Sequence, residues 1–483
     1  MKRVMNSIWN LMKLSALNPS KLLPLAVYVN KFPSACLLAI FIFPLSVFVS
    51  CSQEEFLPKE TTALQFVVSD FPAFGEDAQT RAIGTQDEGK TAWADGDNIL
   101  VHLYSQKYGD QAVTLTFDAE NNTWESDGGT LSYLENDTPT ITAVYAPDCE
   151  IKSDKTIGLL EGKQYGEAEY ILARTTISEN SLDINFEGGR TYSRLRIAGL
   201  ANQTLTVTTT DFTPAGATEV ATAAYTLTTD NNGNAFLDGV FAEDATVSVK
   251  QGDITLKDYT FTAEKNPNGT EHNKSYALDA TPVIDGTLGG KATATEDDIT
   301  ALVEQLKEYV GNGITTIIVP GSEPALIEMD SWTNTAIGEA IYRLSGSDDY
   351  DENNPYNGKI DLILQDVTEI VDQEFYSAWA LNSITLPKVI KIGDEAFHRT
   401  WFLKTITFES VLTEVNETGG VMFAQVGKEV GGCDLILNCG QMKANSVPTP
   451  DLTTNTWKFK FENEFKSITL THTGECDECK TLE

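Results

Sequence analysis

The sequence predicts a mainly β protein, in which two β-sandwiches are followed by an α/β solenoid with a helical N-terminal cap. The C-terminal third repeats an apolar pattern at a fixed offset of 22 residues, which indicates stacked coils. The middle of the chain consists of short alternating segments separated by Asn, Asp and Gly clusters, as in sandwiches. With 483 residues and a hydrophobic content of 41%, the chain can form several cores.

The N-terminal segment predicts export. An apolar run of 17 residues, 34–50, follows Lys31 and ends at Cys51. The run is shorter than the roughly 20 residues that a membrane-spanning helix needs, but it is long enough for the core of a signal peptide. We therefore expect a signal peptide over residues 1–50 and an acidic tether over residues 51–62. An uncleaved N-terminal anchor is the alternative, and a start at Met12 is the alternative to a start at Met1.

Val49-Ser50-Cys51 resembles the lipobox of bacterial lipoproteins, with Phe48 at a position where Leu is usual. The resemblance implies that Cys51 is lipidated and becomes the first residue of the mature protein. The acidic residues after Cys51 resemble the tether that directs lipoproteins of Bacteroidetes to the outer face of the outer membrane. What the resemblance implies is an outer membrane lipoprotein that is exposed on the cell surface.

Segments typical of β-strands fill the chain from Leu64 to about Tyr276. Turn-forming clusters such as Asp230-Asn231-Asn232-Gly233 separate many of them. About 215 residues of this kind suffice for two sandwiches, which we expect over residues 63–183 and 184–282.

Two motifs in this region resemble the fimbrillin family, the pilin-like subunits and tip proteins of Bacteroidales. The first is Thr80-Arg81-Ala82 followed by Lys90-Thr91-x-Trp93-x-x-Gly96-Asp97-x-Ile99, and the second runs from Phe186 to Ser193-x-Leu195-x-Ile197. The chain has Gly188-Gly189-Arg190 near a position where the family usually has a His. On the residues alone, Trp93 and Ile99 are core positions and Gly96-Asp97 is a turn.

The fimbrillin resemblance implies that residues 64–71 form a removable edge strand. An exposed loop would follow, in which a trypsin-like protease cuts at Arg81. The strand of a neighbouring subunit can then join the sheet through backbone hydrogen bonds. The alternative is a tightly held first strand in a monomeric protein.

Residues 283–358 are expected to form a linker and the helical cap of the solenoid. Thr295-Glu296-Asp297-Asp298 predicts a capping box, and apolar residues follow at helical spacing until Gly311. A strand is expected from Ile314 to Val319, and a second amphipathic helix around Ile337 and Leu344.

Residues 359–474 contain the repeat, in which Leu362, Ile384 and Ile406 occupy equivalent positions. Ser383-Ile384-Thr385-Leu386-Pro387 alternates as a short strand does, and Pro387 ends it. Asp394 precedes Glu395-Ala396-Phe397, which predicts one helical turn with Phe397 pointing inward. In the next unit, Val415 and Phe423 are expected to fill the Ile and Phe positions after a short insertion.

The pattern Val389-x-x-Ile392-Gly393-Asp394-x-Ala396-Phe397, followed by Leu403-x-x-Ile406, resembles the BspA-type leucine-rich repeat of bacterial surface proteins. The resemblance implies a ligand-binding module for host-matrix proteins or partner bacteria. The expected ligand contacts are the outward Ser383, Thr385, Thr405 and Thr407, together with Tyr376, Trp379, Trp401 and Phe402 near the turns. About half of these aromatic side chains are expected to pack between coils instead.

The formal net charge of −36 makes nucleic-acid binding unfavourable, because such a chain repels phosphate. We find no motif for a catalytic nucleophile, a nucleotide or a cofactor, and predict no enzyme, no cofactor and no metal. In the tail, residues 475–483, Cys476 and Cys479 have the spacing of half a zinc site or of a redox pair, and His472, four residues before Cys476, is a candidate third ligand; free thiols or a tail disulfide are the alternative. Asp348-Asp349-Tyr350-Asp351-Glu352-Asn353 departs from a calcium loop and is expected to be a solvated insertion.

These observations favour a non-enzymatic surface adhesin or fimbria-associated binding protein. The partners would be a host-matrix protein, a glycan or a bacterial surface ligand, with fimbrial subunits as further candidates. A glycan-capture lipoprotein of a nutrient-uptake system is the alternative, and a hydrolase is the third class.

Overall fold

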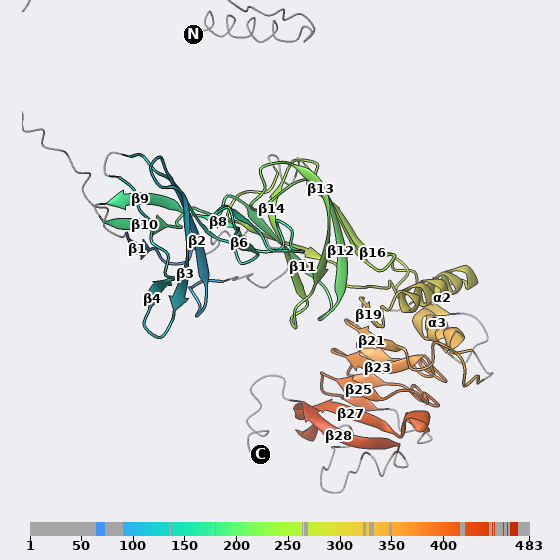
Figure 1. Ribbon diagram of the computed structural model, residues 1–483. Helices are drawn as coiled ribbons and strands as arrows, with labels where there is room; N and C mark the ends of the chain where they lie inside the picture. Colours follow the sequence, from blue (N-terminus) through green and yellow to red (C-terminus); the bar gives the residue numbers. More distant parts are fainter. Residues whose placement is uncertain are drawn as a thin grey trace, which may run out of the picture. The chain divides into compact units, whose positions relative to one another are not determined.

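The computed structural model describes residues 64–72 and 90–471 (Figure 1). The described range excludes residues 135–136, 179, 263, 265–268, 322–324, 328–332, 347–349, 416–420, 444–446, 448, 450–456, 458–460 and 462–463. All described residues belong to one compact unit, Pro58–Glu483. They form mainly β-strands, as the sequence predicts, and among them no helix is long and apolar enough to cross a membrane.

The first core lies between two sheets. One is five-stranded and antiparallel in the order β4-β3-β2-β5-β8. Its strands are β2 (Asn98–Ser105), β3 (Gly109–Asp118), β4 (Thr123–Ser126), β5 (Thr140–Tyr145) and β8 (Ile171–Leu172). The other has the order β1-β10-β9, with β1 (Gln65–Val68), β10 (Ser181–Asn185) and β9 (Arg174–Ser178). Because side chains alternate along a strand, every second residue of β2, including Ile99 and Val101, enters the core that β10 covers with Leu182 and Ile184.

A short hairpin covers part of the outer face of the five-stranded sheet. It consists of β6 (Cys149–Ile151) and β7 (Ile157–Leu159), which pair antiparallel. Its residue Ile151 packs on Leu100 of β2 and Val144 of β5, which face away from the main core. Consequently Leu100 is only 5% exposed although it lies on the outer face.

A seven-stranded sheet follows, in the order β16-β15-β12-β14-β11-β17, with β13 paired to β12. The long strand β12 bends at a bulge, where Asp211 has a φ of 50°, and this bend lets one strand pair with three others. Side chains of this sheet form a separate apolar core. The strands are β11 (Ser193–Ala198), β12 (Thr204–Pro214), β13 (Ala221–Thr228), β14 (Asn234–Phe241), β15 (Thr246–Gln251), β16 (Ile254–Thr260) and β17 (Ser275–Asp279).

The two helices expected between the sandwiches and the repeat are present. Helix α2 (Glu296–Gly311) begins with the predicted capping box, formed by Thr295 and Asp298. Helix α3 (Ala336–Leu344) is almost entirely buried. Arg343 of α3 lies between Glu296 of α2 and Glu339, and it thereby connects the two helices. The short strands β18 (Thr293–Ala294) and β20 (Leu326–Ile327) pair in parallel beside them.

The repeat region forms a six-stranded parallel sheet in the order β19-β21-β23-β25-β27-β28 (Figure 1). The register aligns Leu362, Ile384 and Ile406, so the 22-residue offset predicts the stacking of these strands. Second, shorter strands stack alongside in the order β22-β24-β26. The bounds are β19 (Thr316–Val319), β21 (Ile360–Leu364), β22 (Glu369–Ile370), β23 (Leu381–Leu386), β24 (Lys391–Ile392), β25 (Thr405–Phe408), β26 (Glu414–Val415), β27 (Cys433–Asn438) and β28 (Phe465–Thr471).

Phenylalanine rings also stack from one coil to the next inside the repeat region. Phe375, Phe397 and Phe423 form a column with ring centroids 5.6 and 5.7 Å apart, and none of the three is exposed. Val415 pairs with Ile392 in the second ladder. Both expected replacements, Val415 and Phe423, therefore occupy the positions that the sequence assigned to them.

The expected helical turn after Asp394 is wrong. The segment consists of tight turns, in which Glu395 and Arg399 have φ values of 54° and 62°. The reason is that its backbone N–H groups bond to the next coil: Phe397 donates to Met422 and Arg399 donates to Ala424, each at 2.9 Å. A helical turn needs those donors for itself, so stacking excludes it.

Candidate functional site: the seat of the first strand and the cavity beside it

Residues 64–72 are held by residues from distant parts of the chain, namely β10, Trp93 and Phe186, which we call the seat of the first strand. Strand β1 pairs in parallel with β10, and the order of the sheet places β1 at its edge, as expected. The backbone N–H of Ser69 donates to Ile184 at 2.9 Å, and the indole N–H of Trp93 donates to the Ser69 carbonyl at 2.9 Å. The hydroxyl of Ser69 accepts the N–H of Phe186 at 3.0 Å. The segment is thus held by specific hydrogen bonds as well as by the ladder.

Phe71 is the apolar anchor of this segment and is 6% exposed. Its ring makes edge contacts with Trp93 and Tyr145, at centroid distances of 4.8 and 5.4 Å. Two cations also approach it: Lys90 Nζ at 5.3 Å and Arg190 Cζ at 5.2 Å from the ring centroid. Cation–π contacts of this kind contribute more to stability when they are shielded from water. Through them, Phe71 connects residues 64–72 to a network of charged side chains.

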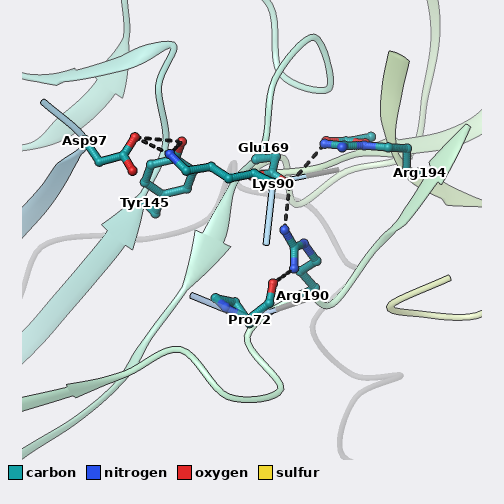
Figure 2. A network of polar contacts seen from close by, with 8 residues as sticks. Pro72, Lys90, Asp97, Tyr145, Glu169, Arg190 and Arg194 are labelled. Atoms are coloured by element: carbon teal, nitrogen blue, oxygen red, sulfur yellow. Dashed lines mark hydrogen bonds and ion pairs between the residues drawn. The ribbon is translucent and has the colours of Figure 1, made fainter. Parts of the chain in front are cut away.

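Figure 2 shows this network, which has two parts. In the first, Arg190 donates to the carbonyl of Pro72 and lies 2.7 Å from Glu169. Arg194 lies 3.1 Å from the same carboxylate and binds Asp238 through two bonds of 2.8 Å. All four charged residues are buried. Two guanidinium groups and two carboxylates balance in charge, which makes their burial tolerable.

In the second part, Lys90 contacts Asp97 and donates to the hydroxyl of Tyr145 at 3.0 Å (Figure 2). Partial burial acts to lower the pKa of Lys90, but the hydrogen bonds to Asp97 and Tyr145 raise it above its ordinary value. Asp97 also accepts the N–H of Ala94 at 2.6 Å, which closes the turn that was expected at Gly96-Asp97. Lys90 therefore connects this turn with Phe71.

A cavity of about 680 Å³ lies on the other side of Asp97 and Tyr145. The outer faces of β2 and β3 form its floor, and the β6–β7 hairpin forms its opposite wall. Asp127, the residue that follows β4, also lines the cavity. The cavity thus shares a wall with the network that holds the first strand.

The expected aromatic ligand contacts of the repeat are not equally accessible. Trp379 has no exposed surface: it stacks on Trp401 at 5.1 Å, and Tyr350 contacts both rings edge-on. The prediction that Trp379 contacts a ligand is therefore wrong, because Trp401 and Tyr350 cover its ring. Tyr376 and Trp401 are each 9% exposed, and Phe402 is half-buried.

The outward hydroxyl side chains of the repeat lie on the strands as expected. Ser383, Thr385, Thr405 and Thr407 are half-buried and face away from the core, since the residues between them are buried. Ser383 donates to Asp361 on the preceding strand at 2.6 Å.

Several sequence expectations lie outside the described residues, namely Cys51, Arg81, His472, Cys476 and Cys479. Asp348 and Asp349 of the acidic loop also lie outside them. Within the described part of the chain, no group of three or more His, Cys, Asp or Glu side chains is placed to hold a metal ion.

Sequence reasoning missed the buried charges of the network. Glu169, Arg194 and Asp238 look like ordinary surface residues in the sequence, and nothing in their spacing predicts that they meet. Arg190 carried the one usable signal, because Gly188-Gly189-Arg190 departs from the pattern of the family it resembles.

No family model matches the sequence, and no curated protein matches it. Among solved structures, a proposed cell adhesion protein from Bacteroides ovatus is similar at 15% identity and a TM-score of 0.25, covering 46% of this chain and 92% of that one. A proposed cell adhesion protein from Bacteroides fragilis has 12% identity and a TM-score of 0.22, covering 45% and 92%. A fimbrial protein from Bacteroides ovatus has 9% identity and a TM-score of 0.23, covering 45% and 48%. TM-scores this far below 0.5 do not establish a shared fold.

Proposed function

We propose that this protein is a non-enzymatic surface adhesin that binds its ligand through the outer face of the parallel sheet. The observation that carries the proposal is the order of that face. Side chains of neighbouring strands align there in two rows, because each strand pairs in register with the next. The rows are Thr316, Asp361, Ser383, Thr405, Asp434 and Ser467, and Ile318, Ile363, Thr385, Thr407, Ile436 and Thr469.

The chemistry of the two rows suits a broad, extended partner. Hydroxyl and methyl groups dominate them, and Asp361 and Asp434 supply the charges at these positions. A sheet face of this kind can contact a protein or glycan surface at many points. Because the chain carries a net charge of −36, a partner with basic patches associates faster than an acidic one, and salt slows that association; a neutral patch is not repelled. Host-matrix proteins, glycans and bacterial surface ligands are the candidate partners.

We propose that lipidated Cys51 anchors the protein to the outer membrane and leaves this face exposed on the cell surface. Membrane attachment by charge is unfavourable for so acidic a chain. Several acyl chains on one residue give stable anchoring, which a single chain does not. The repeat region, which resembles the BspA-type leucine-rich repeat, would then present its sheet to the surroundings.

The experiment compares adhesion of cells that display the intact protein with adhesion of cells that display a chain lacking residues 291–474. Loss of adhesion with normal surface display supports the proposal, whereas adhesion that survives moves the binding site to the sandwiches. A finer test is Thr385→Lys with Thr407→Lys, which places two charges in one row. Thr206→Lys with Thr208→Lys is the matched control, since these threonines are exposed on β12. Equal adhesion of the two double variants would contradict the proposal.

Assembly into a fimbria is a second candidate function, favoured by the position of β1 at a sheet edge. Removal of residues 64–72 would uncover the backbone of β10 and allow a neighbour's strand to pair there. Mild trypsin treatment followed by N-terminal sequencing is the test. Cleavage after Arg81 in the folded protein would support strand exchange, and resistance at that bond would favour a monomer whose first strand stays in its seat.

Glycan capture for nutrient uptake is the alternative function. The cavity beside Asp97 favours it, since concave sites of several hundred Å³ are typical of small-ligand binding.

A further inference from the structure

We propose that the cavity beside Asp97, which lies beneath the β6–β7 hairpin, binds a neutral carbohydrate. The inference extends the alternative function of glycan capture. This site is independent of the sheet face proposed for adhesion, because it is built from the first core's outer face and from no residue of the repeat. Its volume of about 680 Å³ lies within the range of sites for small ligands, which is about 300–1,000 Å³.

The cavity has an apolar floor and a polar rim. Leu100, Ala112 and Ile151 supply the floor, where the hairpin packs on the sheet. The rim carries Thr114, Asp127 and Lys155, which are half-buried or exposed. A carbohydrate has the same division, because its C–H groups form an apolar face and its hydroxyls both donate and accept hydrogen bonds.

The charges around the rim exclude strongly ionic ligands. Glu150 and Lys152 already pair with each other at 2.7 Å, and Asp97 is engaged by Lys90. Asp127 and Lys155 have opposite signs, so the rim as a whole favours neither a polyanion nor a polycation. The carboxylate of Asp127 accepts the N–H groups of Thr114 and Gly129 at 3.3 and 3.2 Å, which leaves acceptor sites for a ligand hydroxyl. A neutral ligand can accept from Lys155 and donate to Asp127 without leaving either charge unpaired.

An extended peptide is disfavoured for a different reason. Strands β2 and β3 each have a neighbour on both sides, in the order β4-β3-β2-β5. Strand β2 is paired along both sides, whereas β4 pairs only with Leu115–Asp118 of β3. Beyond β4, the backbone N–H and carbonyl of Thr114 are bonded to Asp127 at 3.3 and 3.0 Å, so a peptide strand would have to displace Asp127 to pair there. Recognition must come from side chains around the rim, which is how hydroxyl-rich ligands are bound.

The test uses the full chain, labelled with a fluorophore, on an array of neutral, N-acetylated, sialylated and sulfated oligosaccharides. The blocking variant is Thr114→Trp, which fills the cavity from β3. Its control is Thr140→Trp on β5, an exposed position on the same outer face that does not line the cavity. We expect Thr114→Trp to weaken binding of a neutral oligosaccharide roughly tenfold or more, which is a loss of about 1.4 kcal/mol, and Thr140→Trp to leave it unchanged.

The sheet-face variant Thr385→Lys with Thr407→Lys separates this site from the adhesive face. If it abolishes adhesion but retains oligosaccharide binding, the two sites are distinct, as proposed. Circular dichroism checks that Thr114→Trp folds like the wild type. A second variant, Asp127→Asn, leaves the cavity volume unchanged and should weaken binding of the same oligosaccharide. Binding of no oligosaccharide, binding confined to sialylated or sulfated ones, or equal binding by Thr114→Trp and Thr140→Trp would each overturn the proposal.

Discussion

Replacing Glu374 with glutamine should stabilise the repeat region at pH 8 and change little at pH 4. Glu374 lies in the first coil and has no exposed surface. Its carboxylate accepts the N–H of Val371 at 3.0 Å and the hydroxyl of Thr335, the residue that caps α3, at 3.3 Å. Among the described residues, no Lys, Arg or His forms an ion pair with it.

The magnitude follows from the pKa of this carboxyl group. Burial raises it from 4.5 to about 7, and the bonds from Val371 and Thr335 offset only part of that rise. Between these two values the folded chain binds more protons than the unfolded chain, so stability falls as the pH rises from about 4.5 to about 7. Each pKa unit is worth about 1.4 kcal/mol, so the ionised carboxylate costs about 3 kcal/mol above pH 7. Glutamine keeps the shape and removes that cost.

The assay is urea unfolding at several pH values, with hydrogen exchange of residues 335–345 and 370–380 as a local readout. In the wild type, the free energy of unfolding should fall by up to about 3 kcal/mol between pH 4.5 and pH 8, and in Glu374→Gln this fall should shrink by a similar amount. Glu409→Gln is the control, because Glu409 is exposed on the same stack of coils. Parallel pH profiles for wild type and Glu374→Gln would refute the reasoning.

Three further predictions test the anchor, the strand seat and the aromatic column. Cys51→Ser should release the protein from the membrane fraction; a variant that matures and fractionates like wild type would contradict lipidation. Arg190→Met should loosen residues 64–72, since it removes the hydrogen-bond donor to the Pro72 carbonyl and leaves the buried charges unbalanced, at a cost of about 3–5 kcal/mol. The measurement is faster trypsin cleavage near this segment, and Arg174→Met, at an exposed position, is the control. Phe397→Ala should destabilise the coils by about 3–5 kcal/mol, because its ring is fully buried between two others; an unchanged urea midpoint for the coils would exclude the stacked column.

Part of the candidate site could be predicted from sequence, because it depends on neighbours along the chain. The turn at Gly96-Asp97 closes through a bond from Ala94 to Asp97 only three residues away. The position of β1 at an edge was expected from a resemblance rather than from physics. The network of Glu169, Arg190, Arg194 and Asp238 could not be predicted, since its partners are far apart along the chain. Arg194 and Asp238 are separated by 44 residues, and Arg190 and Pro72 by 118.

By itself the sequence determined the features that repeat or act locally. The 22-residue offset sets which apolar residues stack, since each coil buries its face only against an equivalent face, and the capping box of α2 needs only residues 295–298. Tertiary structure alone decided where the remaining polar groups go. The turns at Glu395 and Arg399 replace a helical turn because the N–H groups of Phe397 and Arg399 donate to the next coil. Trp379 is buried because Tyr350, on a loop 29 residues earlier, lies against it. Hydrogen bonds and burial between distant segments cannot be assigned until the chain has brought those segments together.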